Sequence, residues 1–336
     1  MTEQQKLSHL EIPAYERLSG AGIAAGKTIQ GNGMAMTRYQ SRDRTVLTCC
    51  AAAALSLGGC LSASESAVPL RDVGTRGDTP VSESTLIQNR GAKIAFHVTP
   101  ARASGRGPTI VLDAGGGGDS SYWNDLVPEL ARRTGARIIT YDRAGFGASE
   151  ERPGPLKIED AVDDLAQGLK RLGATQNVIL VPHSFAGKIT TYLARQHPEW
   201  ISGAVLVDAN VPPFFTETML DRQSKAYAPA IAAMKQSKDQ TKQTRSQLAL
   251  FESFVETARA YHQVAWPAGV PCTVIVAENT PFEDPIDAGA WRNAQAQFAH
   301  TSRCKLIVAD KSSHDVARDR RDVLIEAVVE MANRVR

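Results

Sequence analysis

Short apolar runs alternate with amphipathic segments along most of the chain beyond residue 92. Runs rich in β-branched residues, bounded by Gly, Pro or polar residues, predict strands at 93–98, 108–113, 136–141, 177–182, 203–208, 272–278 and 304–308. Helical periodicity predicts helices in the gaps, at 158–172, 188–196 and 322–332. Several of the predicted strands are almost wholly apolar, which is typical of strands buried on both faces. The pattern therefore predicts an α/β fold with a mostly parallel central sheet flanked by helices.

The first 60 residues have a different pattern. Arg38, Arg42 and Arg44 precede an uncharged run of small and apolar residues at 45–59. This run of about 15 residues is shorter than the roughly 20 that span a bilayer. A basic segment followed by a short apolar segment is typical of a secretory signal.

A cysteine closes this segment. The sequence Leu-Gly-Gly-Cys at 57–60 resembles a bacterial lipobox. The resemblance implies that Cys60 carries lipid, that the protein attaches to a membrane through this anchor, and that it resides in the bacterial cell envelope. Met34 or Met36 is the expected start of such a signal. Residues 61–84 are rich in Ser, Gly, Pro and charge and lack an apolar period, which predicts a disordered tether.

Composition narrows the function only slightly. With 43% hydrophobic and 22% charged residues, the remaining 85–336 segment is expected to form one domain. The 38 basic and 36 acidic residues are spread along the chain and leave a formal charge of +2, so no charged field favours nucleic acid. We expect a small-molecule substrate rather than a nucleic-acid partner.

A serine follows one predicted strand at a sharp junction. After the run NVILVP, the sequence His183-Ser184-Phe185-Ala186-Gly187 leads directly into a predicted helix. A serine on a tight strand-to-helix turn is lifted above the sheet, and the turn requires small neighbours two residues away on either side. Ala186 satisfies this requirement, whereas Pro182 occupies the place of the usual glycine. Because proline fixes φ and lacks an N–H, this residue could shift the turn.

These residues resemble the nucleophile elbow of the α/β-hydrolase family, and the similarity extends over nearly all of 86–336. The resemblance implies that Ser184 is the nucleophile. It also implies that the loop LDAGGGGDSSYW at 112–123 supplies one oxyanion N–H at Gly116, and that Phe185 supplies the other. The segment YDRAGFGASE at 141–150 resembles a further family motif with a structural role beside that loop, so Asp142 and Arg143 are assigned no chemistry.

The candidate general base is a histidine near the end of the chain. His314 lies after the last predicted strand and before the final helix, where the family places its catalytic histidine. His183 is expected to point away from Ser184. The remaining histidines in the domain read as surface residues, namely His97, His197, His262 and His300.

Several carboxylates compete for the role of the acid. The family usually places the acid after the strand at 272–278, but Thr280 stands at the expected position, which leaves Glu278, Glu283 and Asp284 as candidates. A less common family arrangement uses the preceding strand, which here ends at Asp208. We favour Asp208, with Glu278 and Asp284 as alternatives.

Between the strands at 203–208 and 272–278, a polar and helical insertion occupies about 211–267. The family carries its cap in this position, and the aromatic residues of the insertion indicate a moderately apolar substrate. Cys272 and Cys304 begin two strands that the family fold places side by side, so they could form a disulfide in an oxidising compartment. No Cys and His spacing indicates a metal site, and no cofactor is expected.

The sequence therefore predicts a serine hydrolase that cleaves a carboxylic ester or a similar acyl bond through an acyl-enzyme on Ser184. Carbon–carbon and amide bonds are alternatives, because the same triad serves them. A non-catalytic, surface-anchored binding protein with the same fold is the alternative from another class, and Pro182 and the uncertain acid are its motivation.

Overall fold

The computed structural model describes residues 82–101, 107–238 and 240–335. These residues belong to one compact unit. The predicted signal segment, Cys60 and residues 61–81 of the predicted tether lie outside the described residues. Within the described ranges, no helix is both long and apolar enough to cross a membrane.

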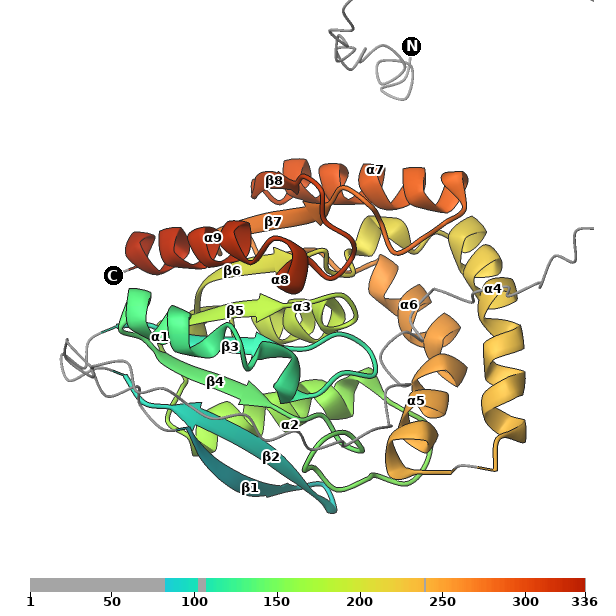
Figure 1. Cartoon of the computed structure of the whole chain (residues 1–336), viewed down its shortest axis with the longest axis horizontal. Coiled ribbons are helices and arrows are strands. Elements are labelled where there is room, and N and C mark those ends of the chain that lie inside the picture. The colour runs from blue at the N-terminus through green and yellow to red at the C-terminus, as the bar shows by residue number, and fades with distance from the viewer. Residues whose placement is uncertain (1–81, 102–106, 239, 336) are drawn as a thin grey trace, which may run out of the picture. The chain divides into compact units, whose positions relative to one another are not determined.

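An eight-stranded sheet forms the centre of this unit, with the strand order β1-β2-β4-β3-β5-β6-β7-β8 (Figure 1). The first two strands are antiparallel to their neighbours, and β3 to β8 run parallel. The mostly parallel sheet predicted from the apolar runs is confirmed. The strands are β1 (Glu83–Asn89), β2 (Ala92–Thr99), β3 (Thr109–Asp113), β4 (Arg137–Tyr141), β5 (Val178–Pro182), β6 (Ile201–Val207), β7 (Cys272–Ala277) and β8 (Lys305–Ala309).

The first strand, β1, was not predicted, and residues 83 and 84 belong to it rather than to a tether. Its sequence lacks the apolar run that indicates a buried strand, and its side chains are mostly exposed. A two-residue turn joins it to β2, and Arg90 and Gly91 have φ of 46° and 82° there. Positive φ at both positions is what a type I′ hairpin turn requires.

Helices cover both faces of the sheet (Figure 1). Alternate strand residues point to opposite faces, so Ile110 and Leu112 join one buried cluster and Val111 joins the other. The first cluster includes residues of α1 (Val127–Thr134) and α9 (Arg321–Arg334). The second includes residues of α2 (Ile158–Arg171), α3 (Ala186–Gln196) and α7 (Pro285–Thr301).

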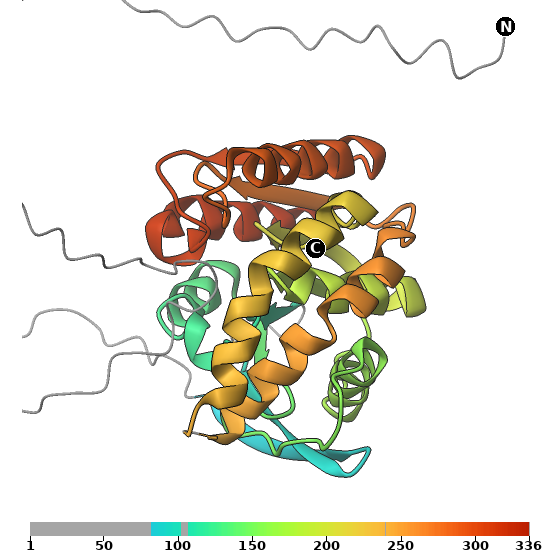
Figure 2. The same cartoon turned by 90° about the vertical axis from the view of Figure 1, so that its right-hand side faces the viewer.

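Three helices are inserted between β6 and β7. They are α4 (Glu217–Gln236), α5 (Lys242–Glu252) and α6 (Phe254–His262), and the short 3-10 helix η4 (Pro212–Phe214) precedes them. They stand together beyond the carboxyl ends of the parallel strands (Figures 1 and 2). The short helices η2 (Ser120–Trp123), η3 (Pro198–Trp200) and α8 (Val316–Asp319) complete the described elements.

A disulfide joins Cys272, at the start of β7, to Cys304, immediately before β8. The two Cα atoms are 4.6 Å apart. Because β7 and β8 are parallel neighbours, their first residues lie side by side, as the disulfide hypothesis required.

Candidate active site

Ser184 occupies a strained turn between β5 and α3. Its φ is 52°, in the left-handed region that residues other than glycine rarely adopt. The turn is held on both sides, because the Ser184 N–H donates to Val207 O at 3.3 Å and the Ser184 carbonyl accepts from Asn210 N–H at 2.7 Å. A Cβ added to Gly187 would lie 2.4 Å from Asn210 O, so this close approach needs a glycine.

Pro182 does not prevent this turn from forming. It is the last residue of β5 and pairs in register with Asp113 of β3. The hydrogen bond to Asp113 O comes from the N–H of His183, at 2.9 Å, so this link does not depend on an N–H from the proline. The departure from the family pattern therefore leaves the elbow geometry intact.

His314 lies within hydrogen-bond distance of both Ser184 and Asp208. Its Nε2 is 2.9 Å from Ser184 Oγ, and its Nδ1 is 2.6 Å from Asp208 Oδ2. An ionised carboxylate can only accept, so Nδ1 carries the proton and donates to Asp208. Nε2 of the neutral ring is then the acceptor for the Ser184 hydroxyl, which is the arrangement that lets the histidine remove that proton.

Asp208 follows β6 and is fully buried, with φ of 38°. Its Oδ1 accepts hydrogen bonds from Trp291 Nε1–H at 2.9 Å and from Ala277 N–H at 3.2 Å. These two donors fix the carboxylate, so that Oδ2 faces His314. Trp291 was missed by the sequence reasoning because it lies in α7, 83 residues further along the chain.

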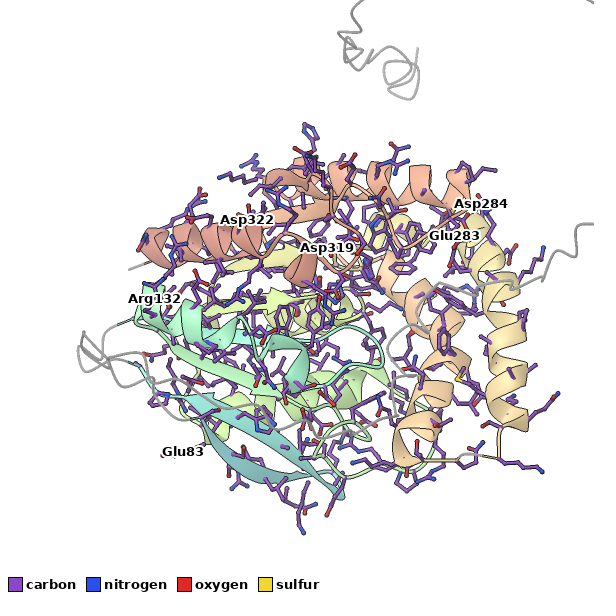
Figure 3. The ribbon with its side chains drawn as sticks, in the orientation of Figure 1. Glu83, Arg132, Glu283, Asp284, Asp319 and Asp322 are labelled. Carbon is purple, nitrogen blue, oxygen red and sulfur yellow. A yellow bond between two sulfur atoms is a disulfide. The ribbon has the colours of Figure 1, made fainter. Side chains whose placement is uncertain are left out.

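Two of the alternative carboxylates, Glu278 and Asp284, have other partners. The Glu278 side chain accepts a hydrogen bond from the Lys311 N–H. Asp284 caps α7 by accepting from Ile286 N–H at 2.8 Å, and it forms an ion pair with Arg222. Glu283 lies beside Asp284 at the start of α7 (Figure 3). Of the carboxylates considered, the structure brings only Asp208 to His314.

The glycine loop after β3 lies directly against the elbow. A Cβ added to Gly115 would be 3.2 Å from Ser184 Cβ, and one added to Gly116 would be 3.4 Å from Phe185 Cβ. Phe185 precedes α3, so its N–H belongs to the group of helix-start donors that have no acceptor within the helix. Among the described residues, neither the Gly116 nor the Phe185 N–H donates a backbone hydrogen bond. Both remain available to a negatively charged oxygen near Ser184.

His183 is buried against the candidate base. Its Nε2 lies 2.9 Å from the His314 carbonyl oxygen and donates to it, and its ring stacks on Tyr122 at 5.0 Å. Burial is the main cause that lowers the pKa of His183 to about 3, so the ring is neutral near pH 7. Tyr122 also donates a hydrogen bond to Asp315 at 2.8 Å. The His183 and Tyr122 side chains therefore hold the segment of residues 314 and 315, which carries the candidate base.

His97 is not the surface histidine expected from the sequence. It is half-buried, its Nε2 lies 3.3 Å from Asp142 Oδ2, and its Nδ1 lies 2.7 Å from Ser84 Oγ. Asp142 also accepts from the N–H groups of Ser120 and Ala148. Burial alone would raise the pKa of Asp142, but these hydrogen bonds outweigh it and hold the pKa below its usual value.

The insertion covers the glycine loop. Leu250 of α5 lies 3.7 Å from the position of a Cβ on Gly116, and Gln243 of the same helix donates to Gly117 O at 3.1 Å. Lys242 donates to the carbonyls of Gly147 and Ser149 at 2.8 and 2.7 Å. Helix α5 therefore forms one wall above the predicted oxyanion donors.

A fully buried lysine joins the insertion to α3. The Lys188 Nζ lies 4.7 Å from the centre of the Phe215 ring, 5.1 Å from that of Phe254 and 5.7 Å from that of Phe185. It donates one long hydrogen bond to Thr257 Oγ1, at 3.4 Å. Burial lowers the pKa of Lys188 to about 7. The described residues include no group of three or more His, Cys, Asp or Glu arranged to hold a metal ion.

Comparison with known proteins agrees with this architecture. The model of the alpha/beta hydrolase fold family matches residues 108–265. The chain is 37% identical over 115 residues to a putative non-heme chloroperoxidase of Synechocystis, covering 34% of this chain and 41% of that protein. It is 33% identical over 104 residues to the putative carbamate hydrolase RutD of Azorhizobium caulinodans, covering 31% of this chain and 38% of that protein. The chain thus spans less than half the length of these curated relatives.

Solved structures match over a longer stretch. The enol-lactonase from Burkholderia xenovorans has a TM-score of 0.54 and 20% identity, covering 74% of this chain and 100% of that chain. A hydrolase from Pseudomonas aeruginosa has a TM-score of 0.53 and 18% identity, covering 74% and 97%. Together with the sheet order and the elbow, these matches show that the chain has the α/β-hydrolase fold.

Proposed function

We propose that this protein is a serine hydrolase that cleaves a carboxylic ester, or a similar acyl bond, of a small and moderately apolar substrate. The observation that carries the proposal is the continuous hydrogen-bonded chain from Ser184 through His314 to Asp208. The left-handed φ of both Ser184 and Asp208 supports it, because backbone strain of this kind concentrates at functional sites.

The chemistry follows from the protonation states. His314 Nε2 takes the proton of Ser184 as Oγ attacks the carbonyl carbon, and Asp208 stabilises the imidazolium that forms. The carbonyl oxygen becomes an oxyanion and accepts hydrogen bonds from Gly116 and Phe185, each worth about 3 kcal/mol in the transition state. The leaving alkoxide takes the proton from His314. Water then hydrolyses the acyl-enzyme by the same steps.

The apolar surroundings of the site support the substrate class. Phe185 and Leu250 lie against Gly116 of the glycine loop, and Phe215 belongs to the same buried apolar cluster. Such a lining favours an apolar acyl group. The name of one relative, a putative carbamate hydrolase, is consistent with acyl chemistry on this scaffold.

The test is hydrolysis of p-nitrophenyl esters of short and medium acyl chains. We expect Ser184→Ala and His314→Ala to lower kcat by about 10⁴-fold or more. Ser224→Ala and His300→Ala, both exposed on helices away from the triad, are the matched controls and should retain full activity. A fluorophosphonate should label the wild type but not Ser184→Ala. A folded wild type that neither hydrolyses esters nor reacts with the fluorophosphonate would instead support the non-catalytic binding protein.

We also propose that Cys60 carries a lipid anchor in the cell envelope. The disulfide supports this location, since disulfides persist in oxidising compartments. In a bacterial host, the wild type should partition into detergent and Cys60→Ser should not. Equal partitioning of both would refute the anchor.

A further inference from the structure

Arg143 lies behind the glycine loop, in the turn that follows β4, and its side chain is 5% exposed. Its Nη1 donates to Asp113 Oδ1 at 2.6 Å and to Ala114 O at 2.5 Å. Its Nη2 donates to the carbonyl oxygens of Gly115 and Gly118. One guanidinium therefore holds three carbonyl groups of the loop that carries a predicted oxyanion donor.

The direction of a carbonyl fixes the direction of the next N–H. In a trans peptide the two bonds point to opposite sides of the chain, and the described residues contain no cis peptide. The carbonyl of Gly115 and the N–H of Gly116 belong to the same peptide unit. Because Arg143 draws the Gly115 carbonyl toward itself, the Gly116 N–H is directed away from Arg143.

The loop has little else to fix this direction. Glycines have no side chain and wide freedom in φ, and within residues 114–118 the only backbone-to-backbone hydrogen bond joins Gly118 N–H to Gly115 O, at 3.2 Å. The guanidinium also contacts the second donor residue, since its Cζ lies 5.7 Å from the centre of the Phe185 ring. Arg143 therefore contacts both residues that supply the predicted oxyanion donors, through the Gly115–Gly116 peptide unit and the Phe185 ring.

We propose that Arg143 is a positioning residue for the oxyanion hole. By holding the carbonyls of the glycine loop, it aims the Gly116 N–H at the oxygen on which charge develops. Arg143 makes no contact with the substrate itself. This inference rests on the proposed serine hydrolase function and assigns a catalytic consequence to a residue of a motif for which the family resemblance implied a structural role.

The shape of the side chain matters for this role. Arg143 reaches the Asp113 carboxylate and three carbonyls with two separate nitrogens in a rigid plane. Lysine has one nitrogen and cannot span the same acceptors. Asp113 balances the buried charge, and it also accepts from Tyr141 OH at 2.8 Å. Arg143→Lys should therefore keep a buried cation beside Asp113 while releasing part of the loop.

A second, half-buried arginine provides the matched control. Arg152 donates to both oxygens of Asp164, at 2.8 and 2.9 Å, and to Asn89 O at 3.2 Å. Its side chain is 18% exposed and that of Asp164 is 3% exposed. This pair joins the β1–β2 hairpin to α2 and none of its hydrogen bonds reaches the glycine loop. Arg152→Lys therefore makes the same chemical change in an ion pair outside the site whose carboxylate is buried.

The experiment measures p-nitrophenyl acetate hydrolysis per active site and the affinity for phenylboronic acid. Ser184 Oγ adds to boron and its proton passes to His314, so the tetrahedral boronate carries negative charge into the oxyanion hole. We expect Arg143→Lys to lower kcat by about 10- to 100-fold with KM changed less than about threefold, because a misdirected donor loses part of its effect. Phenylboronic acid affinity should fall by a similar factor. Arg152→Lys should leave kcat and the affinity unchanged.

Three results would overturn the inference. They are a kcat in Arg143→Lys equal to that of the wild type, a kcat loss with no loss of boronic acid affinity, and an equal kcat loss in Arg152→Lys. If Arg143→Lys does not fold, Asp113→Asn replaces it: loss of the carboxylate charge loosens Arg143, and kcat and boronic acid affinity should again fall together. A wild type without hydrolysis or fluorophosphonate labelling would refute the proposed function itself, whereas an active wild type with unaffected Arg143 variants would refute this inference alone.

Discussion

The carboxyl end of the sheet and the α4–α6 insertion meet at the start of α3, and different contacts surround the buried charged groups of each. At the sheet end, buried polar groups such as Asp208 and Arg143 are fixed by hydrogen bonds to backbone atoms. On the insertion side, the rings of Phe215 and Phe254 surround Lys188, which has one long hydrogen bond.

The difference follows from what each region must do. Hydrogen bonds depend on direction, so they can aim a carboxylate or a peptide group. Apolar burial is not directional and mainly excludes water. Changes at the sheet end should therefore lower activity more than stability, and changes on the insertion side should do the opposite.

The largest effect is expected for Asp208→Asn. The amide oxygen can still accept from Trp291 and Ala277, so the fold should be retained. Its NH₂ group would face His314 Nδ1 and favour the wrong tautomer, so we expect kcat to fall by about 10⁴-fold. Ester hydrolysis and thermal unfolding of the same preparation measure both quantities. The matched variant is Glu278→Gln. An equal loss of kcat in that variant would mean that Glu278, after β7, is the acid of the triad.

Lys188→Met should change stability and its pH dependence. Because burial lowers the pKa of Lys188 to about 7, the unfolded chain binds this proton more tightly than the folded one. The free-energy cost of burying protonated Lys188 is therefore fully present below pH 7. It decreases as the pH rises toward the pKa that Lys188 has in the unfolded chain. Relative to Lys188→Met, the wild type should gain up to about 1.4 kcal/mol of unfolding free energy per pH unit above pH 7.

Urea denaturation at several pH values between 6 and 9 measures this slope. Lys225→Met, at an exposed position of α4, controls for the loss of one positive charge. Parallel curves for the wild type and Lys188→Met would mean that Lys188 keeps its usual pKa. The kcat of Lys188→Met for ester hydrolysis at pH 7 should fall less than that of Asp208→Asn.

The disulfide tests a third region, the amino end of the sheet. Cys272 and Cys304 are separated by 32 residues, and removal of such a cross-link costs about 3 kcal/mol of unfolding free energy. Both cysteines lie at the starts of parallel strands, whereas Ser184 and Asp208 follow the ends of theirs. The Cys272→Ala/Cys304→Ala double variant should therefore unfold at lower denaturant and keep its kcat. A loss of kcat in the folded double variant would show that the two ends of the sheet are coupled.

Buried strands were predictable because they leave a continuous apolar run bounded by turn residues. The elbow and His314 were found through the family resemblance, since their neighbours in sequence form compact motifs. The choice between Asp208 and its alternatives was open, because acidic residues follow both β6 and β7. The orientation of the Asp208 carboxylate depends on Trp291, whose indole reaches Asp208 only after α7 packs on the sheet.

Other features left misleading signals. Asp284 followed by proline is a helix-start signal, and it begins α7, yet the same aspartate was a candidate acid. Arg143 and Lys188 are buried, although charged residues in a sequence normally indicate an exposed position. Burial of a charge depends on partners that are distant in sequence, so no local pattern indicates it.

The smallest effect is expected where the two regions join. Tyr261 of α6 is buried, and its hydroxyl lies 2.9 Å from Thr191 Oγ1, 3.2 Å from Gly187 O and 3.0 Å from Asn210 O. Tyr261→Phe keeps the ring but leaves these acceptors without that donor, at a cost of about 1 to 2 kcal/mol of unfolding free energy. Denaturation with urea measures the loss.

The elbow itself should tolerate this change. Hydrogen bonds from Asn210 and Gly187 N–H groups to Ser184 O remain in Tyr261→Phe, so kcat should change by less than about threefold. Tyr192→Phe is the control on α3, because within the described part of the chain the Tyr192 hydroxyl makes no hydrogen bond. A kcat loss as large as that of Arg143→Lys would contradict the division between the two regions, since a contact of the insertion would then be setting the direction of the nucleophile.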